Sequence, residues 1–149
     1  MSSSPGTRAI WGIFTVAIAL VWGINGLWCK VLGGVPRHEA IVARVVDTAT
    51  DIVGLDLDAA AAAAAAGVLV RVIGLSELTM VVWFVSGRWV RLNALAQVVI
   101  VMTMNVIEQL LAPELLLFGP WNFLWASCFS AAVLVRTRLH VQRLAQEGA

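Results

Sequence analysis

The sequence carries few charged residues. Only 13% of its 149 residues are charged and 60% are apolar, whereas a soluble domain usually has about 25% charged and 45–50% apolar residues. These charges are too few to cover the surface of a soluble monomer of this size. The composition therefore favours a protein that lies partly in lipid, and the length allows a single domain. The net charge is only +1, which excludes the strongly basic surface expected of a protein that binds nucleic acid.

Cysteine is also scarce. Cys29 and Cys128 are the two cysteines of the chain, and they form no CxxC pair. Cys29 ends a long apolar stretch, while Cys128 lies ~20 Å inside another at the rise of an α-helix. A disulfide requires Cα atoms within ~7 Å, so we interpret both as small packing residues without redox or metal chemistry.

Four apolar stretches of about 20 residues cover most of the chain, which is the length that a helix needs to cross the hydrocarbon core. The predicted spans are residues 9–29, 67–86, 92–112 and 115–135. We therefore expect an all-α integral membrane protein, with one transmembrane domain folded as a four-helix bundle. The first stretch is longer than a signal-peptide core and no small-x-small cleavage site follows it, so we interpret it as a retained span.

The connection between the first two spans has its own pattern. Pro36 suits the first turn of a helix, and apolar residues recur at helical spacing through residues 36–52. This pattern predicts an amphipathic helix, either lying in the membrane interface or packed on the end of the bundle. Eight alanines follow at residues 59–66. We expect them to extend the second span, because alanine is the best helix former, although the alanines leave the exact start of this span open.

Lysine and arginine set the orientation of a membrane protein. In the four-span arrangement, the cations outside the spans on one side are Lys30, Arg37 and Arg44. The opposite side has Arg8, Arg88, Arg91, Arg136, Arg138 and Arg143. We expect both termini in the cytoplasm, which makes the first connection face outward.

Three charged residues fall inside the predicted spans, namely Arg71, Glu77 and Glu108. An ionisable residue in hydrocarbon is costly and is a functional candidate by default. Arg71 and Glu108 each lie four residues from the outer end of a span, or ~6 Å deep, so we expect them to pair. Glu77 lies nearer the middle of its helix.

Polar residues from all four spans and the first connection fall in the same outer half. We predict that they form a pocket open to the outer face. Its members are Asn25, Arg37, His38, Arg71, Glu77, Asn105, Glu108 and Asn122. The alternative is that the amide side chains only join helices, at ~0.6 kcal/mol for each hydrogen bond.

A metal or haem is not expected. His38 is the only histidine near the predicted pocket, and His140 falls on the opposite side. One histidine with two glutamates is a donor set known for iron, but no Glu-x-x-His pair is present. Two histidines on opposite sides cannot hold one haem between them.

The run Pro36–Glu39 and the Asn-x-x-Glu pair of Asn105 and Glu108 occur together with Ile73–Glu77 and Ala112–Gly119. In these residues the sequence resembles the DoxX-like family of small four-span bacterial membrane proteins. The resemblance covers residues 11–130 and is most specific in the first two of these motifs. It implies four helices in one bundle in a bacterial inner membrane.

The wider group is named for a subunit associated with a terminal quinol oxidase and with thiosulfate:quinone oxidoreduction, although many members have no established activity. The resemblance therefore implies a non-catalytic accessory or ligand-binding component of a membrane redox system, with a quinone as candidate ligand. One alternative is a quinone-binding oxidoreductase subunit in which Glu77, Glu108 and His38 handle protons. Another is a small transporter or lipid-binding protein. The expected partners are the lipid bilayer and either other membrane subunits or further copies of the chain, with no nucleic acid.

Overall fold

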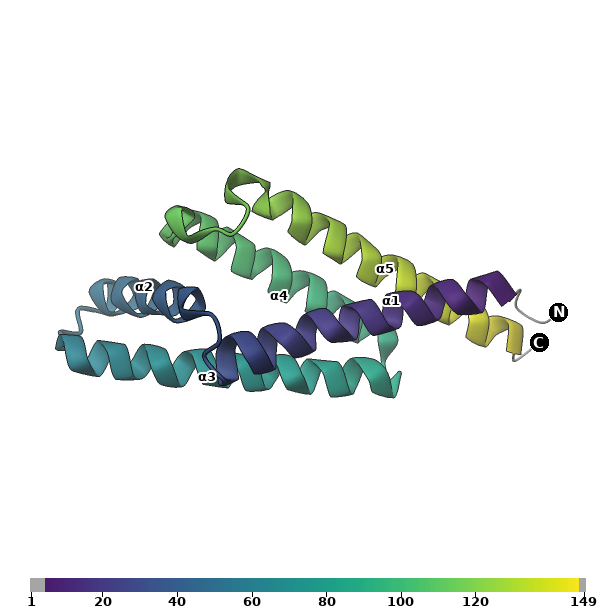
Figure 1. Ribbon diagram of the computed structural model, residues 1–149, viewed down its shortest axis with the longest axis horizontal. Coiled ribbons are helices and arrows are strands. Elements are labelled where there is room, and N and C mark those ends of the chain that lie inside the picture. Colours follow the sequence, from purple (N-terminus) through teal and green to yellow (C-terminus); the bar gives the residue numbers. More distant parts are fainter. Residues whose placement is uncertain (1–4, 148–149) are drawn as a thin grey trace.

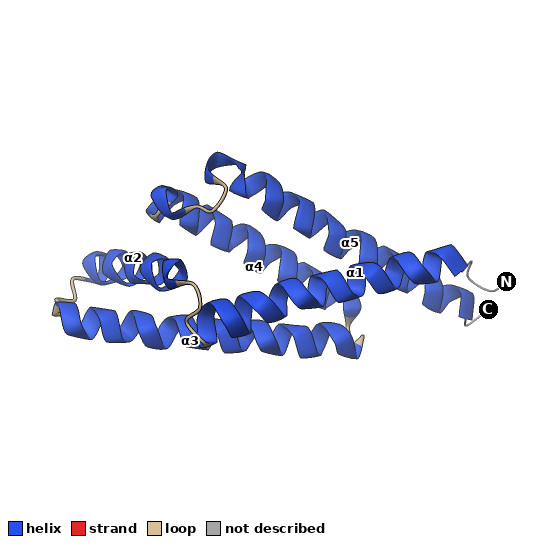
Figure 2. Cartoon of the chain, viewed as in Figure 1, coloured by secondary structure: helices blue, strands red, loops and turns tan. Residues whose placement is uncertain are grey.

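The computed structural model describes residues 5–147, and all regular structure in this part of the chain is helical (Figures 1 and 2). The elements are α1 (Pro5–Gly23), the π-helical segment η1 (Ile24–Val31), α2 (Pro36–Val53), α3 (Ala59–Ser86), α4 (Val90–Leu111), the 3-10 turns η2 (Pro113–Leu115) and η3 (Gly119–Trp121), and α5 (Asn122–Glu147). The all-α prediction is confirmed.

Three stretches are long and apolar enough to cross a membrane. They are Ala9–Val31, Ala59–Ser86 and Val90–Leu111, and they overlap the first three predicted spans. Large apolar side chains such as Ile13 and Leu110 are exposed along their outer faces. Apolar surface on this scale requires a non-aqueous neighbour, and the chain is a multi-pass membrane protein whose helices contact lipid.

The helix in the region of the predicted fourth span begins later than expected. Pro113 and the Gly119–Pro120 pair interrupt the apolar run, so residues 113–121 form two 3-10 turns and α5 starts only at Asn122. The part of α5 before Arg136 is shorter than the ~20 residues of a spanning helix, and α5 is not among the three candidate spans. A fourth crossing, and with it a four-span bundle, stays a prediction.

The ends of α2 and α3 follow from local chemistry. Asp58 caps α3, since its Oδ1 accepts a hydrogen bond of 2.7 Å from the backbone nitrogen of Ala61, so the alanine run extends the helix as predicted. Gly54 and Gly87 end α2 and α3 in the left-handed region, each with φ of 67°, where glycine has no steric penalty.

The helices pack in two units that meet along α1 and in a shared apolar core of α1, α3, α4 and α5, which contains Ile18, Phe84, Ala94 and Val133. In one, α2 lies on the N-terminal half of α3 around Val42, Ala66 and Val70. In the other, α4 and α5 lie side by side, and α1 contacts both α3 and α5 (Figure 1). The helix predicted over residues 36–52 is thus present as α2, while its position in a membrane interface stays a prediction.

Candidate functional site

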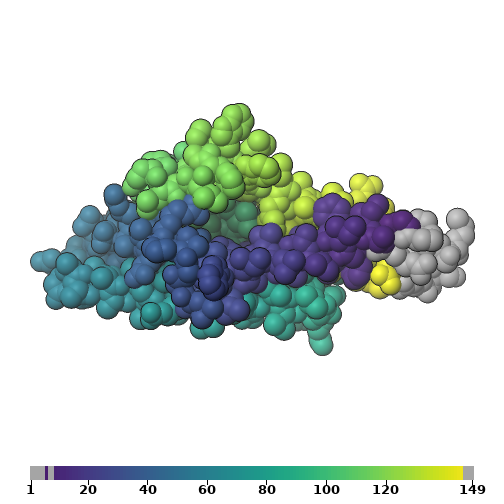
Figure 3. Space-filling model, viewed as in Figure 1, coloured from purple at the N-terminus to yellow at the C-terminus, as the bar shows by residue number. Residues whose placement is uncertain are grey.

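A cavity of about 370 Å³ lies where the two packing units diverge. Figure 3 shows this face of the molecule hollowed between α1 and α2 below and α4 and α5 above. Seven of the eight predicted pocket residues line it: Asn25, Arg37, His38, Glu77, Asn105, Glu108 and Asn122. Lys30 also lines it, and this residue is absent from the set predicted from the sequence.

The rest of the lining is aromatic and aliphatic. It includes Trp22, Ile100, Met104, Phe118, Trp125 and Phe129. Two aromatic pairs are among them: Trp22 meets Phe129 edge to face at 6.2 Å, and Phe118 lies 5.6 Å from Trp125. The cavity therefore has a polar end and an aromatic wall, as sites for amphipathic ligands do.

Glu77 is held by two partners from the end of the first span. Lys30 Nζ forms an ion pair with Glu77 Oε1, and Asn25 Nδ2 donates to both carboxylate oxygens at 3.2 and 3.1 Å. Lys30 is only 5% exposed and Glu77 only 6%. Buried charges persist when they are paired and hydrogen-bonded, so the group is a fully partnered polar cluster at the wall of the cavity.

The π-helical form of η1 brings Asn25 and Lys30 to the same carboxylate. Five residues along a regular α-helix turn ~140°, which would separate these two side chains. In a π-helix the backbone bonds instead join residues i and i+5, so the two residues lie on one side. Such segments are frequent at functional sites.

A glycine contact lets η1 approach α3 closely enough for this pairing. A Cβ built on Gly26 would lie 2.7 Å from the carbonyl oxygen of Gly74, and a Cβ on Gly74 would lie 2.7 Å from that of Gly26. No other residue fits these two positions without movement of the backbone. Small residues permit close helix crossings of this kind in membranes.

Arg37 and His38 enter the cavity from the first turn of α2. Arg37 Nη1 donates to the backbone carbonyl of Leu115 at 2.9 Å, which ties α2 to the turn after α4. Burial, together with the charges of Lys30 and Arg37, lowers the pKa of His38 to about 4. His38 is therefore neutral near pH 7, and its buried Nδ1 has no partner among the described residues.

Asn105, Glu108 and Asn122 join α4 to the start of α5. Asn122 Nδ2 donates to Asn105 Oδ1 at 2.8 Å and to Glu108 Oε2 at 3.5 Å. The charges that act on Glu108 are those of Arg37 and Lys30. Since neither cation is in contact with Glu108 in the described structure, the space between the carboxylate and α2 is open to a polar group of a ligand.

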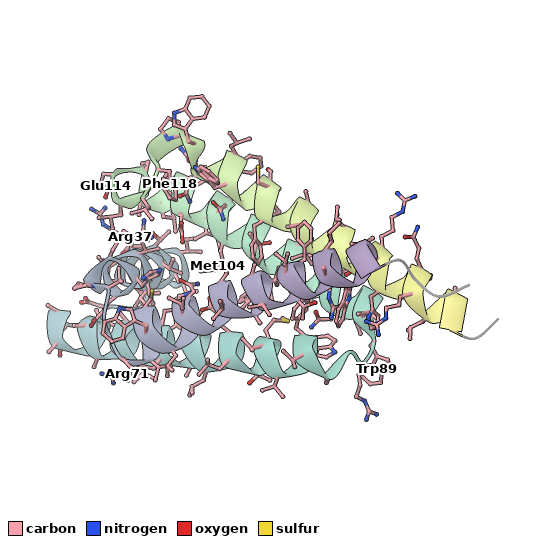
Figure 4. The ribbon with its side chains drawn as sticks, turned by 45° about the vertical axis from the view of Figure 1, so that its right-hand side comes forward. Arg37, Arg71, Trp89, Met104, Glu114 and Phe118 are labelled. Atoms are coloured by element: carbon pink, nitrogen blue, oxygen red, sulfur yellow. The ribbon has the colours of Figure 1, made fainter. Side chains whose placement is uncertain are left out.

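Arg71 lies elsewhere, and its predicted pairing with Glu108 is wrong. Arg71 is exposed and lines a second, smaller cavity with Glu39. Figure 4 shows it on the side of α3 away from Arg37, Met104 and Phe118. The reason is helical geometry, because six residues separate Arg71 from Glu77 and turn the helix to a position ~120° away.

A pair of buried amide side chains fixes Trp22 in the cavity wall. Trp22 Nε1 donates to Gln97 Oε1 at 2.7 Å, and Gln97 Nε2 donates to Asn93 Oδ1 at 2.6 Å. Gln97 is fully buried. Asn93 and Gln97 were not predicted as site residues, although their i, i+4 spacing inside an apolar helix is a signal for a shared polar contact.

Three comparisons with known proteins bear on this arrangement. A family model described as the DoxX-like family matches residues 19–135, which include every residue that lines the main cavity. No curated protein and no solved structure matches the chain. Within residues 5–147, no group of three or more histidine, cysteine or acidic side chains is placed to hold a metal ion.

Proposed function

Because the chain belongs to the DoxX-like family, we propose that it is a non-catalytic, ligand-binding component of a membrane redox system. The observation that supports the proposal is the main cavity, which combines an aromatic wall with a partnered polar end. A quinone suits this shape, since its ring packs against aromatic side chains while its carbonyl oxygens accept hydrogen bonds. Asn25, Arg37, His38, Asn105 and Asn122 are the residues that we expect at the polar end.

The test is a search for bound quinone in the purified protein. The chain is isolated in mild detergent, and its organic extract is analysed by mass spectrometry and by an ultraviolet absorption spectrum. Met104→Trp fills the cavity, while Leu110→Trp adds the same ring to an exposed position on the same helix. We expect about one quinone per chain in the wild type and in Leu110→Trp, and at least tenfold less in Met104→Trp. Equal amounts in all three, or none in the wild type, would reject the proposal.

A second candidate is a quinone-binding oxidoreductase subunit in which Glu77 and Glu108 move protons. The observation in its favour is that both carboxylates line the same cavity as His38. This function predicts that Glu108→Gln abolishes quinone reduction in reconstituted membranes while quinone remains bound. An accessory component instead keeps both its ligand and its larger partners in native mass spectrometry after the same substitution.

We also propose the orientation of the chain in the membrane. With both termini in the cytoplasm of a bacterial inner membrane, the α2–α3 hairpin and the main cavity lie toward the outer face. A fluorescent protein that folds only in the cytoplasm, fused after residue 149, should be bright. A dark fusion that is stably produced would reverse the orientation.

A further inference from the structure

A second cavity of about 90 Å³ lies beside Lys30. It is formed by the end of η1, the loop to α2, the first turn of α2 and the middle of α3. Its lining includes Cys29, Gly33, Glu39, Gly67 and Arg71. A single water needs ~10–15 Å³ of probe-occupied space and two to four polar partners, so this cavity has room and partners for water.

Lys30 is the one described residue that lines both cavities. Its side chain is almost fully buried, and its ammonium group is held by Glu77 at the wall of the main cavity. The two cavities differ in character. The main cavity is mostly aromatic and aliphatic, whereas the second is bordered by the exposed, charged side chains of Glu39 and Arg71.

We propose that the second cavity is a water-filled entrance that connects the Lys30–Glu77 pair to the aqueous phase, separately from the main cavity, with Lys30 as the wall between them. An amphipathic ligand in the main cavity then leaves the ion pair in contact with water.

Cys29 is a natural reporter for this entrance, because it lines the second cavity and the other cysteine, Cys128, lies exposed on α5. In Cys128→Ser protein in lipid nanodiscs, we expect iodoacetamide, a small water-soluble reagent, to modify Cys29. Gly67→Leu places a side chain in the cavity and should slow the reaction at least tenfold. Gly12→Leu, at a position with no neighbour within 4 Å, should leave the rate unchanged.

Two further experiments test the separation of the cavities. Met104→Trp fills the main cavity and should not change the rate at Cys29. Ala126→Cys, in protein without the two native cysteines, places a reporter in the main cavity. Lys30→Ala should then raise its rate at least tenfold, and adding Gly67→Leu should reverse the increase.

Three results would overturn the inference: a rate at Cys29 that is insensitive to Gly67→Leu, one that falls with Met104→Trp, or no effect of Lys30→Ala on the reporter at position 126. None of these measurements uses a ligand. Their failure is therefore distinct from a failure to find quinone, which concerns the proposed function alone.

Discussion

The Lys30–Glu77 pair makes a sharp prediction about stability. Both side chains are buried, and Asn25 adds two hydrogen bonds to the same carboxylate. Removing one member of a buried ion pair leaves the other charge without compensation, at a cost of ~3–5 kcal/mol. We expect Lys30→Met and Glu77→Met each to lower the free energy of unfolding by this amount.

The double variant should behave differently. Lys30→Met with Glu77→Met removes both charges at once, and an apolar pair of similar volume often replaces a buried ion pair without loss. The double variant should therefore lose much less stability than the sum of the single variants, with a coupling energy of at least ~2 kcal/mol. The measurement is reversible denaturation in detergent micelles, followed by tryptophan fluorescence and by circular dichroism.

The chain contains a matched control pair. Arg44 Nη2 lies 3.3 Å from Glu114 Oε1, and the two side chains are 59% and 54% exposed. Exposed ion pairs contribute ~0.2–1 kcal/mol, so the same cycle at Arg44 and Glu114 should give a coupling in that range. Additive losses at Lys30 and Glu77, to within ~0.5 kcal/mol, would refute the ion pair.

Four other predictions follow from single contacts. Gly74→Ala should destabilise the protein by ~1–3 kcal/mol, because the added methyl group would collide with Gly26 where η1 crosses α3. Gly12→Ala should be neutral or stabilising by up to ~1 kcal/mol. Equal effects of the two substitutions in denaturation would contradict the close contact between η1 and α3. Gln97→Leu should cost ~1–3 kcal/mol, because it leaves the buried indole N–H without its acceptor, and should shift tryptophan emission; an unchanged spectrum would contradict this. Arg136 is buried between two aromatic rings, with its Cζ 4.2 Å from the centre of the nearer ring. Arg136→Lys should therefore lower the free energy of unfolding by ~1–2 kcal/mol. An unchanged free energy of unfolding would contradict this prediction. Burial lowers the pKa of His38 to about 4, so between about pH 6.5 and pH 4 the unfolded chain binds a proton that the folded chain does not bind. The free energy of unfolding should therefore fall as the pH falls through this window. The fall should be smaller in His38→Gln.

The sequence was sufficient for the fold wherever length and apolar composition decide the structure. Three candidate spans overlap the first three predicted ones, and α2 lies close to the bounds predicted for it, since continuous apolar runs and a helical period constrain such segments strongly. The helix expected from residue 115 begins only at Asn122, because Pro113 and the Gly119–Pro120 pair interrupt regular helix within an apolar run. Hydropathy counts apolar residues and does not register such interruptions.

The site was predicted by depth, and depth alone does not say which way a side chain points. Seven pocket residues lie in the cavity because they share both a depth and a face. Arg71 shares the depth but lies on another face of α3 from Glu77. Lys30 falls just outside the predicted span of residues 9–29, since a sequence pattern with the period of an α-helix does not indicate the π-helical segment that turns Lys30 toward Glu77.

The formal charges of the side chains around the main cavity cancel, and this balance suits a cavity inside a membrane protein. Lys30 and Arg37 supply two positive charges, and Glu77 and Glu108 supply two negative ones. His38 adds none near pH 7, because burial and the neighbouring cations lower its pKa. An uncompensated charge in a low-dielectric interior costs several kcal/mol, so a balanced set lets the chain hold polar groups at this depth. A neutral amphipathic ligand preserves this balance, whereas an anion or a cation disturbs it.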